Sequence, residues 1–333
     1  MWRKEQLDFI AIGDITIDAF IRLQDAKVHC TIDTEKCELC VRFGDKIPYE
    51  SVTIVPAVGN SANAAVSASR LGLTSGLITT IGDDQNGKDC LEKLRIENVS
   101  TKYLNIQHGT PTNYHYVLWY ESDRTILVKH QAYTYVFPKE LPEPKWIYLS
   151  SLGEHAVGLQ VEVADYLKKH TEIKLAFQPG TFQMKLGFER LRDIYARTDV
   201  FFCNKDEAQN ITGNKSEDMK ELLAAVRTLG PKVAIITDGP KGAYASDGTV
   251  RLKVPIYPDR IPPVERTGAG DAFASSVVSA LIAGLPLSEA LLWGPANAMS
   301  VVEHIGAQEG LLSRKGLEEL LSKAPADFRT EEF

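Results

Sequence analysis

The 333-residue sequence has few cysteines and no long run of basic residues. Its five cysteines are an odd number with no export signal, which favours free thiols over a disulfide framework. Lys and Arg together number 37 against 44 Asp and Glu, a net charge of −7. A general nucleic-acid binder needs a basic face to neutralise phosphates, so we expect no nucleic-acid partner.

The sequence also lacks the patterns of export and of membrane spans. Residues 1–8 are charged and lead directly into an apolar run, without the cleavage site of a signal peptide. The longest uncharged stretch, residues 272–288, contains serines, a glycine and a proline, which is typical of a buried helix rather than a membrane span. We expect a cytoplasmic protein without a membrane partner.

Two patterns alternate along most of the chain. Short apolar runs are followed by amphipathic stretches whose apolar residues recur every three or four positions, the spacing of one helix face. The runs predicted to form strands are 9–12, 76–81, 146–149, 173–177, 200–203 and 233–237. The stretches predicted to form helices are 61–71, 87–97, 158–169, 217–229 and 272–283. This order predicts an α/β fold with a mostly parallel central sheet flanked by helices.

Residues 19–56 and 101–135 interrupt the alternation. Both segments are rich in β-branched and aromatic residues and show no convincing helix pattern. We predict that they form a small β-sheet inserted into a body made of residues 1–18, 57–100 and 136–333. A small sheet at the carboxyl edge of a parallel sheet is well placed to act as a lid over a site there.

The strongest chemical signal is the segment Thr-Gly-Ala-Gly-Asp-Ala-Phe at 267–273, at the start of a long apolar helix. Gly268, Ala269 and Gly270 at a helix N-terminus leave backbone N–H groups free to bind an anion such as phosphate. Asp271 would repel a phosphate, but it could accept a proton from an alcohol that attacks one. A tight turn followed by an acid that merely favours the first helical turn is the alternative interpretation.

Four further segments extend this signal. Gly-Asp-Ile-Thr-Ile-Asp at 13–18 follows the first predicted strand, and Val-Gly-Asn-Ser-Ala-Asn at 58–63 leads into a helix. Asn-Lys-Asp-Glu at 204–207 and Thr-Asp-Gly-Pro-Lys-Gly at 237–242 lie at the ends of two later strands. With residues 267–273, these segments resemble the ribokinase / PfkB carbohydrate-kinase family along nearly the whole chain. The resemblance implies a ribokinase-like (Rossmann-like) fold and a kinase that uses ATP and Mg²⁺.

The resemblance also implies roles for individual residues on the acceptor side. Asp18 and Asn63 would bind substrate hydroxyl groups, because a carboxylate accepts hydrogen bonds and an amide both donates and accepts them. Gly59 would let the backbone approach the substrate closely. Asp271 would be the general base, with residues 268–270 as the anion hole.

On the nucleotide side, the resemblance implies that Asn204 and Glu207 organise the magnesium ion, Glu207 acting through water. The residues that it places along the nucleotide are Thr237, Gly239, Gly242 and Asn297, the last of them beside adenine. Taken separately, Asn204 and Glu207 are also consistent with an ordinary helix start. Residues 237–242 are likewise consistent with a simple hairpin turn.

The chain departs from the family pattern just before the anion hole. Glu265 and Arg266 stand where the family usually has Asp-Thr. Many members bind a monovalent cation such as K⁺ there, so activation by K⁺ is left open. Arg266 either replaces that cation in part or faces solvent. Gln178 stands where the family often has Asn or Asp, which leaves the identity of the substrate open.

The first lid segment contains four soft metal ligands within twelve residues, namely His29, Cys30, Cys37 and Cys40. Such a set could hold a structural Zn²⁺ ion tetrahedrally. The alternative, which we favour, is that Cys30 packs within a strand and that these cysteines are buried or surface thiols.

Aromatic residues crowd into positions 114–120 of the second lid segment. They could stack on a sugar or a base, but we favour a role in the core of the lid or at the face of a homodimer formed through the lid. Lys129 and His130 follow, and we expect both to be solvated.

The sequence therefore predicts an ATP-dependent kinase that phosphorylates a primary hydroxyl group of a small sugar resembling ribose or fructose. A nucleoside kinase for an adenosine-like or cytidine-like acceptor is the alternative within the family. A sensor that binds a sugar or nucleotide without catalysis is the alternative from another class. Asp271 and its anion hole argue against the sensor, because binding alone needs neither.

Overall fold

The computed structural model of the protein describes residues 7–30, 37–120 and 123–333. In these residues, ten strands form a central sheet in the order β16-β15-β14-β13-β12-β11-β10-β1-β6-β7. In this order, neighbouring strands from β13 through β12, β11, β10, β1 and β6 to β7 pair in parallel. Strands β14, β15 and β16 at the other edge pair antiparallel. Their bounds are β1 (Phe9–Ile12), β6 (Ser75–Gly82), β7 (Leu104–Gln107), β10 (Trp146–Leu149), β11 (Lys174–Phe177), β12 (Val200–Asn204), β13 (Val233–Thr237), β14 (Ala243–Ser246), β15 (Arg251–Val254) and β16 (Glu331–Glu332).

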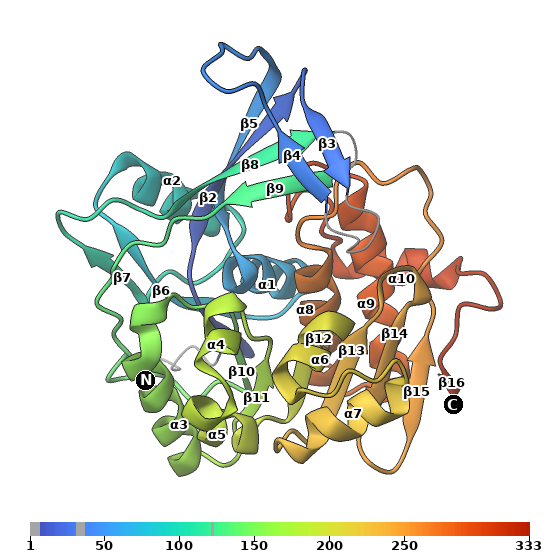
Figure 1. Cartoon of the computed structure of the whole chain (residues 1–333). Helices are drawn as coiled ribbons and strands as arrows, with labels where there is room; N and C mark the ends of the chain where they lie inside the picture. Colours follow the sequence, from blue (N-terminus) through green and yellow to red (C-terminus); the bar gives the residue numbers. More distant parts are fainter. Residues whose placement is uncertain (1–6, 31–36, 121–122) are drawn as a thin grey trace.

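Helices cover both faces of this sheet (Figure 1). One face packs on α1 (Asn60–Arg70), α2 (Gln85–Ile96), α8 (Ala269–Ile282), α9 (Leu287–Val302) and α10 (Arg314–Ser322). The other packs on α3 (Val157–Lys169), α5 (Phe188–Arg197), α6 (Lys205–Thr212) and α7 (Met219–Thr228). Shorter helical turns are η1 (Glu154–Ala156), α4 (Thr181–Leu186) and η2 (Gly239–Lys241).

The strands at the middle of the sheet, such as β1 and β10, are apolar because both of their faces are buried. In β1, Phe9 and Ala11 belong to one core cluster while Ile10 and Ile12 belong to the other, as the alternation of side chains along a strand requires. Burying one such large apolar side chain contributes about 1.5–3 kcal/mol. The two core clusters hold the sheet and its helices as one three-layered body.

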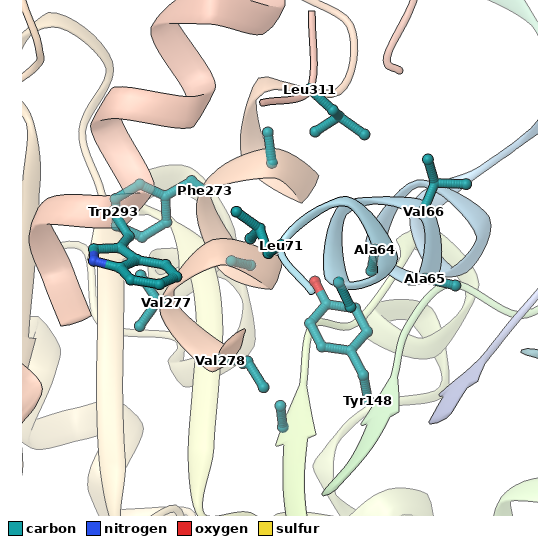
Figure 2. Packing of buried hydrophobic residues seen from close by; sticks show 14 of the residues in the cluster. Ala64, Ala65, Val66, Leu71, Tyr148, Phe273, Val277, Val278, Trp293 and Leu311 are labelled. Carbon is teal, nitrogen blue, oxygen red and sulfur yellow. The ribbon is translucent and has the colours of Figure 1, made fainter. Parts of the chain in front are cut away.

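The predicted fold class and the predicted elements of the body are confirmed. Strands 9–12, 146–149 and 233–237 coincide with β1, β10 and β13. Helix α8 begins at Ala269, three residues before the predicted start at 272, because the anion-hole segment itself enters the helix. Figure 2 shows Phe273 and Val277 of α8 packed near Trp293, and Tyr148 reaching from its strand toward α1. No helix in the described parts of the chain is long and apolar enough to cross a lipid bilayer.

A smaller sheet lies above α1 and α8, and we call it the lid because it contains strands from the two segments expected to form one (Figure 1). Its strand order is β5-β2-β8-β9, with bounds β2 (Thr16–Leu23), β5 (Tyr49–Val58), β8 (Tyr114–Tyr120) and β9 (Asp123–Leu127). Residues 101–135, expected to belong to the lid as a whole, are divided between the two sheets. β7 pairs with β6 at the edge of the central sheet, and only β8 and β9 join the lid.

The lid sheet has an inner and an outer face of different character. The register pairs Asp18 with His115 and Trp119 with Arg124, so these side chains share the inner face, where Trp119 is buried. Ala19 pairs with both Ile54 and Tyr116 on the opposite, outer face. Exposed apolar residues of this outer face are Val52, Ile54, Tyr116 and Leu127.

The structure does not support the less favoured interpretation of the first lid segment, a zinc site. Strands β3 (Lys27–Cys30) and β4 (Cys37–Cys40) form a two-stranded hairpin in which Cys30 lies opposite Cys37. Cys37 is disulfide-bonded, whereas Cys40 is a free thiol. A disulfide sulfur cannot supply the thiolate that zinc requires. The expectation of free thiols is therefore wrong for Cys37, and the loop at 31–36 lies outside the described residues.

Candidate active site

The first turn of α8 places the acid of the 267–273 segment in the interior. Gly268 precedes the helix in the left-handed conformation, with φ of 82°. A Cβ atom at this position would lie 2.3 Å from the Cβ atom of Ala307, so no larger residue fits without displacement. The backbone N–H groups of Gly270 and Asp271 belong to the first turn, where no intrahelical acceptor reaches them. Asp271 itself is only 7% exposed.

Three amide side chains donate hydrogen bonds to the Asp271 carboxylate. Asn60 Nδ2 lies 2.9 Å and Gln178 Nε2 lies 3.2 Å from Oδ1. Asn63 Nδ2 lies 2.8 Å from Oδ2. Asn60 and Asn63 come from the first turn of α1, and Gln178 follows β11. These contacts bring together residues that lie 93 to 211 positions apart in the sequence.

Further hydrogen bonds fix the orientation of two of these amides. The Tyr148 hydroxyl donates to Gln178 Oε1, which directs the Gln178 NH₂ group to Asp271. Gln308 Nε2 donates to Asn63 Oδ1 over 3.1 Å, which directs the Asn63 NH₂ group there as well. Burial and the nearby Asp271 carboxylate raise the pKa of Tyr148 well above its usual value, so Tyr148 stays a donor.

The environment of Asp271 suits a base at neutral pH. Burial raises the pKa of Asp271 to about 6, the three amide hydrogen bonds act to lower it, and the charge of Asp18 raises it further. Near pH 7 the carboxylate is therefore mostly ionised while its basicity is well above that of an exposed Asp. A buried carboxylate with this pKa can accept a proton from a bound hydroxyl group.

A cavity of about 310 Å³ opens beside Asp271. Its polar lining includes Asn60, Arg124, Asn204, Glu207, Arg266 and Asp271, together with Thr267, Gly268 and Gly270. The anion-binding helix end, the base and the expected metal-organising pair thus face one space. Arg124 enters this space from the lid and was not predicted to be part of the site.

Asn204 and Glu207 form a reciprocal helix cap as well as lining the cavity. Asn204 Oδ1 accepts from the Glu207 backbone N–H over 2.8 Å, and Glu207 Oε2 accepts from the Asn204 backbone N–H over 2.8 Å. The ordinary helix-start interpretation is therefore correct for these atoms. The second carboxylate oxygen of Glu207 remains for a ligand in the cavity, and a hard ion such as Mg²⁺ or its water suits such an oxygen. Burial raises the pKa of Glu207.

A second cavity of about 340 Å³ adjoins the first. Thr237, Gly239 and Gly242 line it, as expected for the nucleotide loop. Gly242 has φ of 88°, and a Cβ atom there would lie 2.1 Å from the Val254 carbonyl oxygen, so the loop requires glycine. The residues common to both cavities are Thr237, Arg266, Gly270 and Phe273, which places the junction at the start of α8.

Asn297 does not line either of these cavities. It is fully buried in α9, where its Nδ2 donates to Ser276 Oγ over 2.8 Å and its Oδ1 accepts from the Leu312 backbone N–H over 2.9 Å. The expected contact with adenine is not supported by this placement. Asn297 instead ties α9 to α8, while its helix neighbours Pro295, Ala298 and Met299 face the cavity.

The expected acceptor residues lie on the lid side of Asp271. Asp18 is 7% exposed, and its Oδ1 lies 3.4 Å from His115 Nδ1 on the inner lid face. Neither Asp18 Oδ1 nor His115 Nε2, both buried, has a hydrogen-bond partner in the described structure. Gly59 has φ of 107°, and a Cβ atom there would lie 2.8 Å from the Asp14 carbonyl oxygen.

His130, expected to be solvated, is instead part of a second buried pair. Its Nδ1 lies 2.9 Å from Asp14 Oδ2, and its side chain is 16% exposed. Asp14 also accepts from the Tyr135 hydroxyl and from the Gly153 backbone N–H. The rings of His130 and His115 are 5.4 Å apart, so the two pairs are neighbours. A histidine in an irregular segment has no periodic pattern that could have revealed this.

Glu265, at the departure from the family pattern, is 2% exposed. Its Oε1 accepts from the Thr267 backbone N–H over 2.8 Å, and its Oε2 lies 3.7 Å from Arg124 Nε. The carboxylate in the position associated with a monovalent cation thus lies beside a guanidinium group of the lid. Arg266 is exposed and lines both cavities. These contacts do not test activation by K⁺, which the sequence left open.

The chain is similar to known kinases along most of its length. The model of the pfkB family of carbohydrate kinases matches residues 25–314. The chain is 28% identical to ATP-dependent 6-phosphofructokinase of Thermoanaerobacterium thermosaccharolyticum, over 75% of this chain and 80% of that protein. It is 28% identical to ribokinase of Bacillus subtilis, over 84% and 92%, and 29% identical to cytidine kinase of Thermococcus kodakarensis, over 74% and 88%.

A solved structure has the same fold. The structure of Arabidopsis thaliana ribokinase complexed with ribose and ATP superimposes with a TM-score of 0.77 at 20% sequence identity. The superposition covers 96% of this chain and 100% of that one. The fold is therefore ribokinase-like, as the sequence motifs implied.

Proposed function

Because this chain belongs to the pfkB family of carbohydrate kinases, we propose that it transfers the γ-phosphoryl group of ATP to a primary hydroxyl group of a small sugar. The observation that carries the proposal is the position of Asp271. Its buried carboxylate lies at the start of α8, where the two cavities meet. A kinase that draws on ATP works where ATP is abundant, so we place this protein in the cytoplasm.

In the proposed reaction, Asp271 accepts the proton of the acceptor hydroxyl as its oxygen attacks the γ-phosphorus. A new O–P bond forms, the bond from the γ-phosphorus to the β,γ-bridging oxygen breaks, and ADP leaves with that electron pair. The backbone N–H groups at residues 268–270 stabilise the negative charge of the transferring group. Closure of the lid would exclude water, which would otherwise compete with the acceptor.

The donor side of the proposal includes Mg²⁺. A bound magnesium ion would neutralise part of the phosphate charge. Glu207, through water, would hold it beside Asn204, because both residues line the cavity next to Asp271. Thr237, Gly239 and Gly242 would border the rest of the nucleotide.

The residues on the lid side of Asp271 favour a polyhydroxylated substrate. Asp18 Oδ1 and His115 Nε2 are buried without hydrogen-bond partners among the described residues. A sugar hydroxyl group both donates and accepts, so it can satisfy a carboxylate and an imidazole together. We therefore prefer a free sugar such as ribose or fructose as the acceptor.

A nucleoside is the second candidate acceptor. His130 and Phe182 meet edge to face with ring centroids 5.3 Å apart, next to His115, and could form a wall for a base. Similarity to a cytidine kinase agrees with this reading. The aromatic side chains at 114–120 support it less, because Tyr116 is on the outer lid face and Trp119 stacks with Arg22. A non-catalytic sensor would not need the buried base.

The proposal is tested by ADP release with Mg-ATP against free sugars, sugar phosphates and nucleosides. We expect one acceptor class to stimulate release in the wild type. Asp271→Asn should lower kcat by about 10²–10⁴-fold with little change in KM, since it removes the base, keeps the size of the side chain and leaves one of its two terminal oxygens to accept from the neighbouring amides. Glu289→Gln, an exposed acid in the first turn of α9, is the matched control. Near-normal turnover in Asp271→Asn would refute the assignment.

We further propose that two copies of the chain associate through the outer lid face. Val52, Ile54, Tyr116 and Leu127 are each between 43% and 59% exposed there. An apolar sheet face of this kind is rarely left open to water. A second copy presents the same apolar face, which satisfies the requirement of a two-fold interface for self-complementarity.

A further inference from the structure

We propose that Arg124, carried on the lid, is a catalytic residue that contacts the transferring phosphoryl group when the lid is closed. This inference rests on the proposed function and adds a residue to it. Arg124 lies in β9, outside every segment that carried the family resemblance, and it lines the cavity that also holds Asp271.

The register of the lid directs Arg124 into the site. Arg124 pairs with Trp119 across β8 and β9, so it shares the inner face with Asp18 and His115. A one-residue shift in register would instead place it among the exposed apolar side chains of the outer face. Its side chain is 26% exposed, consistent with a group that lines a cavity at the body.

Glu265 holds the guanidinium group beside the anion hole. Its Oε2 is buried and lies 3.7 Å from Arg124 Nε, while its Oε1 is bonded to the Thr267 backbone N–H. A buried carboxylate is costly without a positive partner, so this pair draws the lid toward the body. Because Glu265 is three residues before Gly268, the pair places the arginine at the start of α8.

The charges that line the cavity indicate how Arg124 would act on the transferring phosphoryl group. Asp271 and Glu207 bring negative charge to the lining, and Arg124 and Arg266 bring positive charge. A phosphoryl group in transfer carries its charge on three equatorial oxygens, and the planar fork of an arginine can donate to two of them at once. Arg266 belongs to the body and is present with the lid open or closed. Arg124 is the cation whose arrival depends on closure.

This dependence of Arg124 on lid closure would couple phosphoryl transfer to acceptor binding. Asp18 and His115, which are proposed to bind the acceptor, lie on the same sheet face as Arg124. An acceptor that fastens this face to the body also brings Arg124 to the phosphate. With no acceptor bound, the pair with Glu265 alone holds the lid to the body, so Arg124 is less firmly positioned and attack by water gains less stabilisation.

The test compares Arg124→Gln with Arg22→Gln. Arg22 is an arginine on the same lid face that stacks on Trp119 and pairs with Glu50, and it is not part of the cavity lining. We expect kcat to fall about 10²-fold or more in Arg124→Gln, with KM for ATP and acceptor changed less than about threefold, because the contact forms in the transition state. Arg22→Gln should keep kcat. Arg124→Lys keeps the positive charge but loses the forked donor geometry, so its kcat should lie between those of Arg124→Gln and Arg22→Gln.

A second measurement does not depend on turnover. The affinity for ADP with fluoroaluminate, which mimics the transferring group, should weaken at least about tenfold in Arg124→Gln, while the affinity for ADP alone should not change. Thermal melting of each variant checks that it is folded. An unchanged fluoroaluminate affinity would overturn the inference, whatever the catalytic outcome.

The two proposals fail in different ways. If Arg124→Gln retains wild-type kcat while Asp271→Asn is inactive, the role of Arg124 is wrong and the kinase assignment stands. If the wild type phosphorylates no acceptor, the proposed function is wrong, and the fluoroaluminate measurement still decides whether Arg124 contacts a phosphoryl group.

Discussion

At the scale of single residues, the site is organised around one carboxylate and the donors that face it. Asn60, Asn63 and Gln178 all present NH₂ groups to Asp271, and Tyr148 and Gln308 fix which way two of these amides point. The donors favour the ionised form, while burial opposes it. The balance sets the pH at which Asp271 can act.

The decrease in kcat/KM at low pH, the acid limb of the pH profile, should report the ionisation of the Asp271 carboxylate. Because only ionised Asp271 can accept a proton, kcat/KM should fall as the pH drops below about 6. Asn60→Ala removes a donor to the ionised form, so the pKa of Asp271 should rise and the limb should move to higher pH. Asn210→Ala, on the exposed surface of α6, should leave the limb in place.

The measurement is kcat/KM from about pH 5 to pH 8 with a saturating co-substrate, since this range brackets the expected pKa. A limb that stays at the same pH in Asn60→Ala would show that another group titrates. The same raised pKa affects folding. Asp271 contributes most to stability below its unfolded pKa near 3.8, and this contribution is lost as the pH rises through about 6.

At the scale of elements, helix α8 connects the site to the core. Its body is buried between α1 and α9, and its first turn contains both the proposed anion hole and the proposed base. Glycines in the left-handed conformation stand at both ends, Gly268 before the helix and Gly284 after it. The two glycines differ in their surroundings, since only Gly268 meets another residue where a Cβ would be.

A pair of alanine substitutions separates helix strain from site geometry. Gly284→Ala should cost about 1 kcal/mol of stability through its φ of 87° alone, with kcat unchanged. Gly268→Ala carries the same kind of strain at φ of 82° and adds the contact with Ala307, so it should also displace the anion hole. Urea unfolding and kcat are measured for both variants. Equal kcat values for the two would show that the start of α8 is not part of the site.

At the scale of the whole molecule, the two faces of the lid sheet have different proposed roles. The alternation of side chains sends Asp18, His115 and Arg124 inward and Val52, Ile54, Tyr116 and Leu127 outward. Substrate contacts and subunit contacts can therefore lie back to back on the same strands. If two copies share the outer face, each lid moves against its neighbour as well as against its own body.

Association through the outer lid face predicts a dimer that a single charge disrupts. Light scattering should give a dimer mass for the wild type at micromolar concentration and a monomer mass for Ile54→Arg, because a charge buried in the apolar interface has no partner. Ile96→Arg is the matched control, since Ile96 is equally apolar and 67% exposed but lies on α2 of the body. A wild type that is monomeric would refute the interface.

Local patterns were sufficient for some features and not for others. Apolar periodicity predicted the parallel strands β1, β6, β10, β11, β12 and β13 and several of the helices between them, but not the antiparallel strands β14 to β16. The position of β7 was missed because a short strand at a sheet edge has no pattern to distinguish it from a lid strand. Asn297 was assigned from its place in a motif, yet its side chain is used between α8 and α9. The disulfide at Cys37 was not expected, because an odd number of cysteines without an export signal favours free thiols.

By itself, the sequence determined the α/β body, the glycine-rich helix start at 268–270 and the acid at 271, since each depends on residues that are neighbours in the chain. Only the tertiary structure decided which groups surround that acid and which lid residue reaches it. Asn60 lies 211 positions from Asp271, and Arg124 meets Glu265 across a comparable interval. Such contacts depend on strand register and on how two sheets pack, and short-range periodicity does not encode either of them.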